Sequence, residues 1–166
     1  MSTRLSQLPP ERIYSRAVTA MHELRAYPTW QASLKDADVD PAPLSVRILT
    51  VAGVTAPKLY DYYIVTVRRR GGVTARFAHR ADTGDFLEAE AVRTAAVILP
   101  AYADHIDGLV SRLADGNPPT ADVVWYPCVQ SNSRFLPFWM FPIKGRLVYV
   151  RADGVIFDQL TFTMKG

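Results

Sequence analysis

The sequence predicts an α+β fold of two tandem repeats, each a helix on an antiparallel sheet, packed into one globule. Three observations lead to this prediction. The chain has 166 residues, of which 49% are hydrophobic, so it can bury a sizeable core. Its apolar residues recur with a helical period in two stretches and with a strand period in most of the remainder. The tripeptide Arg-Ala-Asp occurs at 80–82 and again at 151–153, and a glycine and a phenylalanine follow both copies.

The first half of the chain predicts a helix followed by four strands. Pro9, Pro10 and Glu11 mark the helix start, because proline is tolerated in the first turn and an acidic side chain favours the positive end of the helix dipole. Pro28 ends or kinks this helix. A short helical turn over 29–35 and a loop over 36–43 follow. The predicted strands cover 44–51, 62–69, 73–80 and 86–89.

Two glycine-containing segments predict tight reversals between these strands. Gly71 and Gly72 follow a strand and precede another, and glycine supplies the positive φ that short hairpins require. In the second segment, Asp82 can cap its own turn through its side chain and Gly84 tolerates positive φ. Turn chemistry therefore explains the Arg-Ala-Asp copies without a catalytic role.

The second half repeats the same order of elements. Helical spacing covers 91–113, with Pro100 expected to kink or divide the helix. The predicted strands cover 122–130, 136–143, 146–151 and 155–162. Asp82 and Asp153 are 71 residues apart, a spacing that fits a duplicated supersecondary unit. We therefore expect one helix-plus-sheet repeat over residues 1–90 and a second over 91–166.

Residues 62–92, YYIVTVRRRGGVTARFAHRADTGDFLEAEAV, resemble the hairpin signature of PepSY domains. The resemblance consists of a strand, a glycine turn, a second strand and the piece ADTGDFL, and residues 138–160 resemble it more weakly. It implies a helix on a small antiparallel sheet, similar to the cystatin layout. It also implies non-enzymatic roles, as peptidase propeptides, inhibitors, or sensory and accessory modules. No catalytic residues come with this resemblance.

Charge and cysteine content narrow the classes of function. The formal net charge of +3 is too small for a nucleic-acid-binding footprint, so no nucleic-acid partner is expected. Cys128 is the single cysteine, which excludes an intramolecular disulfide. The apolar run over 95–103 is interrupted by proline and is too short to cross a bilayer. The N-terminal residues contain no apolar signal region, so we expect a cytoplasmic protein without membrane contact.

No catalytic or metal-binding pattern emerges from the residue spacing. The three histidines, His22, His79 and His105, lack the helical i, i+4 spacing of a zinc site. Cys128 is either a nucleophile or a structural thiol, and nothing beside it favours the first. The acidic residues at 82, 85, 88 and 90 are close enough for acid–base chemistry but lack a calcium-loop pattern. We expect no cofactor and no metal, and the residue pattern favours a non-enzymatic protein but leaves an enzyme open.

Two groups of residues are candidate binding residues. Arg68, Arg69 and Arg70 can hold a phosphate, a carboxylate or an acidic partner, or can form a charged hairpin tip that protects a sheet edge. The second half is rich in aromatic residues, and strand alternation there makes both faces apolar. One face covers the core, and the other meets a helix, the other repeat, a second subunit or a ligand. The aromatic candidates are Trp125, Tyr126, Phe138 and Trp139.

These features support two functional hypotheses of different classes. The first is a non-catalytic binding or accessory protein, such as an inhibitor, an immunity-type protein or an assembly factor, that acts through a sheet face or edge. Its partner is another protein or a second copy of the chain. The alternative is a small-molecule-binding enzyme or carrier with a pocket in a curved sheet, lined by aromatic residues, aspartate and His79.

Overall fold

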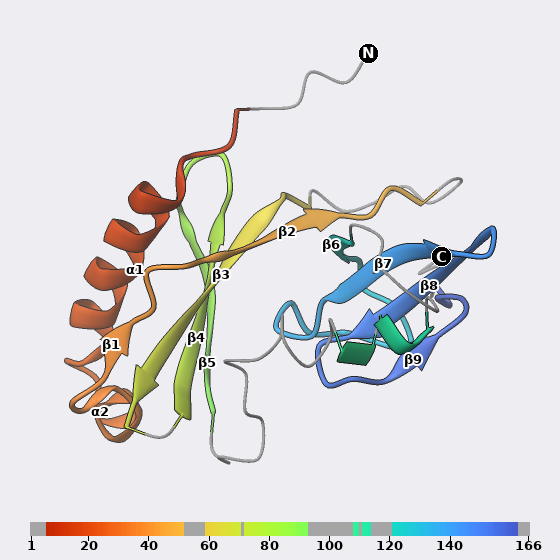
Figure 1. Ribbon diagram of the computed structural model, residues 1–166. Coiled ribbons are helices and arrows are strands. Elements are labelled where there is room, and N and C mark those ends of the chain that lie inside the picture. Colours follow the sequence, from red (N-terminus) through yellow and green to blue (C-terminus); the bar gives the residue numbers. More distant parts are fainter. Residues whose placement is uncertain are drawn as a thin grey trace. The chain divides into compact units, whose positions relative to one another are not determined.

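The computed structural model describes residues 6–51, 59–70, 72–92, 108–109, 111–113 and 121–162 (Figure 1). Their helices and strands make an α+β protein. By its contacts the chain divides into two units, the first Met1–Ser45 with Tyr60–Leu99 and the second Val46–Leu59 with Pro100–Gly166. The division into two repeats at residue 90 stays a prediction.

Two helices begin the first unit. Helix α1 (Pro10–Leu24) follows Pro9, and its stripe of Ile13, Ala17, Ala20 and Met21 is buried. Helix α2 (Pro28–Leu34) also begins with proline, and its last residue is buried. Both helices were predicted. Pro28 separates them because the proline ring cannot continue the preceding helix but fits the first turn of the next one.

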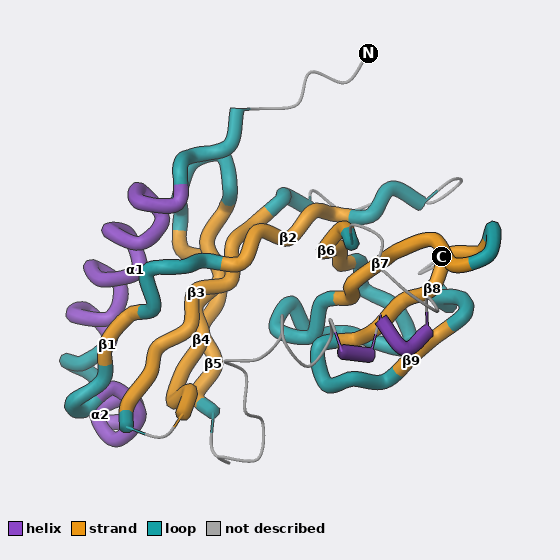
Figure 2. Tube along the Cα trace, viewed as in Figure 1, coloured by secondary structure: helices purple, strands orange, loops and turns teal. Residues whose placement is uncertain are grey.

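The sheet of the first unit is antiparallel (Figure 2). Strand β3 (Tyr62–Arg69) pairs with β4 (Gly72–Arg80), and β4 pairs with β5 (Phe86–Ala91). The loop predicted over 36–43 contains a two-residue strand, β1 (Asp38–Val39), which pairs with the far end of β3. A strand this short leaves no alternating pattern, and the surrounding aspartates and prolines favour a loop instead.

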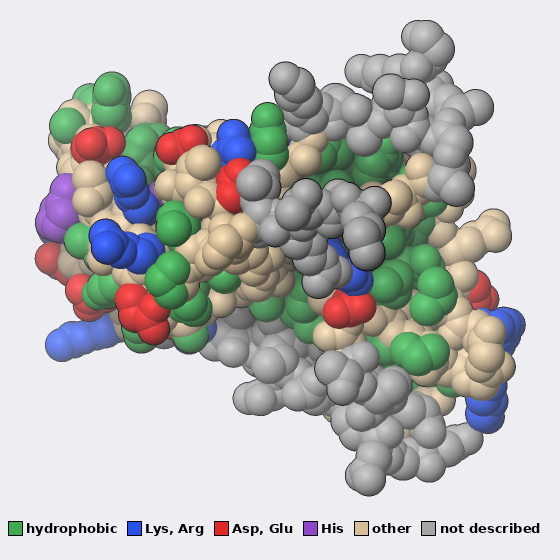
Figure 3. Space-filling model, turned by 90° about the horizontal axis from the view of Figure 1, so that it is seen from above, with side chains coloured by type: hydrophobic (Ala, Val, Ile, Leu, Met, Phe, Trp, Pro, Cys, Tyr) green, Lys and Arg blue, Asp and Glu red, His purple; other side chains and the backbone are tan. Residues whose placement is uncertain are grey.

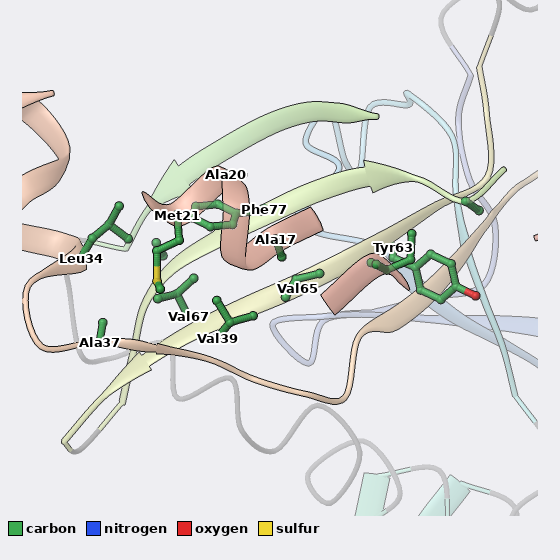
Figure 4. Close-up of a cluster of buried hydrophobic side chains, with 13 residues drawn as sticks. Ala17, Ala20, Met21, Leu34, Ala37, Val39, Tyr63, Val65, Val67 and Phe77 are labelled. Carbon is green, nitrogen blue, oxygen red and sulfur yellow. The ribbon is translucent and has the colours of Figure 1, made fainter. Parts of the chain in front are cut away.

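The core of the first unit lies between α1 and one face of β3 and β4 (Figure 4). Alternate residues of β3, namely Tyr63, Val65 and Val67, point toward the helix, as strand geometry requires. Phe77 of β4 lies opposite Val65 in the sheet, and it is fully buried. The apolar stripe of α1, which has helical spacing, and the alternate residues of β3 and β4 therefore pack together in one cluster.

The strands of this sheet differ sharply in burial. On the face away from α1, Tyr62, Ile64 and Ala78 are buried as well, so β3 and β4 are enclosed on both faces. Strand β5 has no buried residue along its whole length. It is also the last strand of the sheet on its side. The first unit therefore has a protected centre and an exposed edge.

The sheet of the second unit is mixed. Strand β2 (Leu44–Ile48), which belongs to this unit from Val46 onward, pairs in parallel with β6 (Asp122–Trp125) through Arg47 and Ile48. Strands β7 (Phe138–Ile143), β8 (Arg146–Arg151) and β9 (Ile156–Phe157) continue it in antiparallel pairs. The expectation of purely antiparallel sheets was therefore wrong at β2. Alternation identifies the buried face of a strand but not its neighbour.

Strands β6 and β9 are much shorter than the predicted strands over 122–130 and 155–162. Strand β6 ends at Trp125 because Pro127 cannot donate to the ladder, and Cys128 makes only an isolated bridge with Ser131. After β9 no strand is formed within the described residues, and the chain is held at Thr161 by hydrogen bonds with the backbone and with the Gln130 side chain, including Val129 N–H to Thr161 O at 2.9 Å. The Gln130 amide accepts from the Thr161 N–H and donates to the Thr161 hydroxyl, at 2.9 and 3.3 Å.

Both faces of β7 are apolar, as its alternation predicted. Phe138 packs with Val124 and Cys128 on one face. Trp139 and Phe141 point to the other face and are also buried. Half-buried side chains pack against the cluster of Phe138, Val124 and Cys128. They are Leu49, Met140, Tyr149, Phe157, Leu160 and Phe162.

The helix predicted over 91–113 falls largely outside the described residues. Ala91 ends β5 instead of beginning a helix. Residues 108–109 and 111–113 are helical. His105 and Gly71 of the predicted features are also outside the described part. Within that part, no helix has the length and apolar character needed to cross a membrane.

Truncating the centre of the first core should destabilise the protein strongly. We expect Phe77→Ala to lower the free energy of unfolding by about 3–5 kcal/mol, because it removes a fully buried ring and leaves a cavity beneath α1. Urea unfolding followed by circular dichroism measures this. Tyr27→Ala, at a tyrosine that is 59% exposed, is the control and should change stability little. Equal losses in the two variants would contradict this account of the core.

Candidate functional site

The two Arg-Ala-Asp copies form the same side-chain structure. In the first, Arg80 Nε and Nη2 donate to the two carboxylate oxygens of Asp82 at 2.9 and 2.6 Å. In the second, Arg151 Nε and Nη2 donate to Asp153 at 2.8 and 2.7 Å. A planar guanidinium matches a carboxylate in this two-bond geometry. We call each of these pairs an arginine–aspartate fork.

Each fork closes a turn of similar backbone geometry. The alanine inside it is buried, and its N–H donates to the carbonyl just before the facing strand: Ala81 to Asp61 at 2.8 Å, and Ala152 to Pro137 at 2.9 Å. The glycines that follow, Gly84 and Gly154, have φ of 74° and 89°. The second turn is one residue shorter, since Arg80 N–H donates to Asp85 O and Arg151 N–H to Val155 O.

The electrostatics of the forks suit a structural role. The hydrogen bonds from Arg80 and Arg151 lower the pKa of Asp82 and of Asp153 below the ordinary value of a carboxyl. A carboxylate held ionised in this way is a poor general acid. The Arg80 guanidinium also lies 3.6 Å from the ring centroid of Tyr60, and Arg151 Nη1 donates to Gln130 O.

The first turn is also tied to the segment before α1. Leu8 N–H donates to Ala81 O at 2.7 Å, and the hydroxyl of Tyr63 donates to Leu8 O at 3.2 Å. A β-carbon on Gly84 would lie 3.1 Å from Leu8 Cδ1 and 3.3 Å from Cγ of Arg16. Glycine therefore serves both the backbone conformation and the close approach of α1.

The predicted arginine cluster is divided among different partners. Arg68 pairs with Asp40 at 2.8 Å, and Arg69 Nη1 donates to Ala32 O at 3.3 Å. Arg70 is exposed at the tip of the hairpin. Two of the three guanidinium groups thus serve contacts within the first unit.

The four predicted aromatic binding residues are all buried. They are Trp125, Tyr126, Phe138 and Trp139, and they belong to the second unit. The guanidinium of Arg134 lies 5.4 Å from the ring centroid of Trp125. In this structure these side chains contribute to packing and do not form an exposed surface.

Cys128 has the surroundings of a structural thiol. It is buried, and its thiol donates to Ser131 O at 3.7 Å. Burial raises the pKa of the thiol, so little reactive thiolate is present at neutral pH. Among the described residues there is also no group of three or more histidine, cysteine or acidic side chains placed to hold a metal ion.

His79 is a buried histidine with one defined hydrogen bond. Its side chain lies on the α1 face of β4, opposite Tyr63, and the residue is 1% exposed. Nδ1 lies 3.0 Å from Gly84 O, and because a carbonyl can only accept, Nδ1 carries the proton. Nε2 has no hydrogen-bond partner among the described residues, and Phe86 packs against the ring edge to face. Burial, opposed by the hydrogen bond to Gly84, lowers the pKa of His79.

Strand β5 is exposed, and no pattern in the sequence marks it as a site. It was predicted as a short strand, and its acidic residues were noted without a location. Phe86 at its start is 45% exposed, which is unusual for a large aromatic side chain. The available signal was its position as the last strand before the second predicted helix. On the face seen in Figure 3, acidic and basic side chains are otherwise interspersed, without a large patch of one sign.

Comparison with known proteins identifies no relative. No protein-family model, no curated protein and no solved structure matches the chain.

Substituting Gly84 in the turn should destabilise the protein more than substituting Gly72 in the hairpin. We expect Gly84→Ala to destabilise the protein by about 1–2 kcal/mol, because alanine is strained at this φ and its methyl group crowds Leu8. Gly72→Ala is the matched control, since a β-carbon there meets nothing within 4 Å. Thermal unfolding of both variants measures the difference. Equal stability of the two would show that the turn tolerates a side chain.

Stability should fall as the pH is lowered below about 6.5, the ordinary pKa of histidine. The folded-state pKa of His79 is depressed, so the unfolded chain takes up the proton first and unfolding becomes more favourable. The stability that neutral His79 contributes is complete at pH values above the pKa of His79 in the unfolded chain. It is lost as the pH falls through the lower pKa of His79 in the folded protein. Its slope is at most about 1.4 kcal/mol per pH unit.

His79→Asn should flatten this slope, because an amide can still donate to Gly84 O but does not titrate. His22→Asn, at an exposed position of α1, is the control and should retain the slope. Urea unfolding at a series of pH values between 5 and 8 gives the measurement. An unchanged slope in His79→Asn would exclude His79 as its source.

Proposed function

We propose that this chain is a non-catalytic binding or accessory protein that pairs with an extended segment of another protein along the outer edge of β5. The observation that carries the proposal is the burial contrast within the first sheet. β4 is buried along most of its length, whereas β5, its neighbour, has no buried residue and pairs with no other described strand.

The backbone of β5 is arranged for strand addition. Val92 N–H donates to Thr74 O of β4 at 2.9 Å, so in an antiparallel ladder Glu90 and Glu88 also direct their backbone groups toward β4. Ala89 and Ala91 then direct their N–H and C=O groups outward. An edge of this kind is a template for another chain.

The remaining chemistry of the described residues supports binding more than catalysis. The aspartates of the repeated tripeptide are held in forks, and burial makes the thiol of Cys128 unreactive. The four aromatic candidates Trp125, Tyr126, Phe138 and Trp139 are buried. The thiol of Cys128 donates to the backbone carbonyl of Ser131 and not to a side-chain base.

We also propose that the two hairpin-and-turn segments are diverged copies of one unit similar to a PepSY domain. Two correspondences support this. In each segment the fork arginine lies opposite the first residue of the facing strand, Tyr62 for Arg80 and Phe138 for Arg151. Each fork then returns the chain to form the next antiparallel strand, β5 or β9. Inhibitor, propeptide and accessory roles of such domains agree with a binding function.

Proline substitution at the edge tests this function. Ala89→Pro removes an outward N–H and should leave the β4 ladder intact, so the protein should remain folded. Glu90→Pro is the matched control, because its N–H faces β4 and its loss should lower the unfolding temperature. Peptides of about ten residues selected from a random displayed library for binding to the wild-type chain are the probe.

The expected result is that selected peptides slow amide exchange at Ala89 and Ala91. Their affinity should fall at least about tenfold in Ala89→Pro, which corresponds to about 1.4 kcal/mol. Selected peptides that leave these amides unprotected, or that bind Ala89→Pro as well as the wild type, would exclude β5 as the binding edge.

A further inference from the structure

The pair formed by His79 and Phe86 is set apart from the rest of the β4–β5 ladder. Phe86 is the first residue of β5, and it lies opposite His79. The register shifts between Ala78 and His79, so an irregularity separates this pair from those that follow it along β5. Such a shift interrupts the ladder locally. The start of β5 can therefore move while the pairs beyond Ala78 remain in place.

His79 is the buried member of this pair and Phe86 the exposed one. His79 is 1% exposed, whereas Phe86 is 45% exposed. The two rings pack edge to face with their centroids 5.6 Å apart, and Phe86 also packs against Phe77. Phe86 therefore covers a buried imidazole, although it belongs to a strand that has no buried residue.

The surroundings of the imidazole suit its neutral form. Nδ1 of His79 donates to Gly84 O at 3.0 Å, so the lone pair of the neutral ring is on Nε2. Nε2 is buried, and within the described part of the chain it has no hydrogen-bond partner. A second proton would place an N–H group there without an acceptor, which is costly in a buried position. Protonation therefore favours any movement that brings Nε2 to water.

The cationic side chain that faces His79 adds to this cost. Burial lowers the pKa of His79, and the positive charge of Arg16 on α1 lowers it further, against the hydrogen bond to Gly84. From β3 the residue opposite His79 is Tyr63, which is neutral at these pH values. The protonated ring would thus be repelled by α1 and receive no compensating charge from β3.

The acidic residues nearby are engaged elsewhere or directed elsewhere. In the turn, Asp82 is held by Arg80 in the first fork, and Asp85 is exposed to water. The acids of β5, Glu88 and Glu90, lie on the other face of the sheet. The hydrogen bond that the ring of His79 makes goes to a carbonyl and not to a carboxylate.

Among the neighbours of the ring, Phe86 can move at the lowest cost. Helix α1 and strand β3 are joined through the buried cluster of the first unit, to which Ala17 and Tyr63 belong. Phe86 is not part of that cluster, and it lies at the end of an edge strand beyond the register shift. Its displacement exposes the imidazole without opening the core beneath α1, as local opening commonly does.

We propose that His79 is a pH-sensitive switch for the start of β5. While Nε2 is unprotonated, Phe86 stays against the ring and the edge from Phe86 to Ala91 is available to a partner. When Nε2 takes up a proton, Phe86 detaches, the ring gains access to water and the edge shortens. This inference rests on the proposed strand-pairing function, and it adds that acid weakens partner binding.

The switch operates below pH 6.5, the ordinary pKa of histidine, because the pKa of His79 in the folded protein is lower. The closed state is complete at pH values above 6.5 and is lost as the pH falls through the lowered pKa. One linked proton changes the affinity for a partner by at most about tenfold per pH unit.

Amide exchange in the unbound protein tests the switch without any partner. Arg80 N–H donates to Asp85 O at 2.9 Å and reports on the start of β5, whereas Val92 N–H donates to Thr74 O and reports on its far end. After correction for the intrinsic effect of pH, protection of Arg80 should fall at least about threefold between pH 7.5 and 5.5. Protection of Val92 should stay constant. Equal losses at both amides would indicate loss of the whole strand and would overturn the switch.

Two substitutions identify the group that titrates. His79→Asn should remove the pH dependence at Arg80, and His22→Asn on the exposed side of α1 should retain it. Arg16→Gln should move the loss of protection to higher pH, because removing the positive charge raises the pKa of His79. Arg12→Gln, one turn earlier on α1 and also exposed, is the matched control. If His79→Asn does not fold, the comparison of Arg16→Gln with Arg12→Gln decides the test, and equal pH profiles of these two would overturn the switch.

Peptide binding then tests the regulation. The probes are peptides selected at pH 7.5 that slow exchange at Ala89 and Ala91 and contain no histidine, aspartate or glutamate, so that the protein carries the titration. Their affinity should fall between pH 7.5 and 5.5, by no more than about tenfold per pH unit. The fall should be absent in His79→Asn.

The outcomes separate this inference from the proposed function. Peptides that bind equally well at both pH values while Arg80 loses protection would overturn the regulation and retain strand pairing. If no peptide protects Ala89 and Ala91 at either pH, strand pairing is excluded, and exchange at Arg80 still decides whether the switch exists. Constant protection of Arg80 in the wild type would overturn the switch whatever the peptides do.

Discussion

The arginine–aspartate fork is the interaction on which the arrangement of both sheets depends. An exposed ion pair contributes little to stability, and the forks are not deeply buried. Their importance is geometric. Each one joins residues two positions apart just as a strand ends, and so determines where the next strand begins. In the first unit that next strand is β5, and in the second it is β9. The repeated tripeptide is therefore the element that precedes the last strand of each sheet.

The first unit combines a fully enclosed centre with an open side. The apolar stripe of α1 covers one face of β3 and β4, and the opposite face is buried as well. Strand β5 has the same neighbour as β3 but none of this protection. It carries charged side chains, and charged residues on an edge strand are a common way in which natural proteins protect the edge.

Local sequence patterns predicted individual helices, strands and turns. They did not predict which distant segments pair with each other. Proline positions located α1 and α2, and glycine located the turn at Gly84, because these residues restrict the backbone directly. Alternation predicted that Phe138 and Trp139 face opposite sides. It did not predict that β2 would pair in parallel with β6, since alternation carries no information about neighbours. For the same reason β5 was not recognised as an edge. The neighbouring arginines at 68 and 69 separate toward different partners because successive strand residues point to opposite faces.

The hydrogen bonds that tie Leu8 to the first turn have a consequence for the order of folding during synthesis. Leu8 donates to Ala81 and accepts from Tyr63, so the segment before α1 is held by residues made much later. Contacts between distant segments form slowly because a long loop must close first. During synthesis on the ribosome, the apolar stripe of α1 would remain exposed until the β3–β4 hairpin and its turn had emerged. Arg47 and Asp122, which pair across 75 residues, impose a still longer delay on the second unit. The nascent chain would therefore be most vulnerable to aggregation and to chaperone capture before its final third is made.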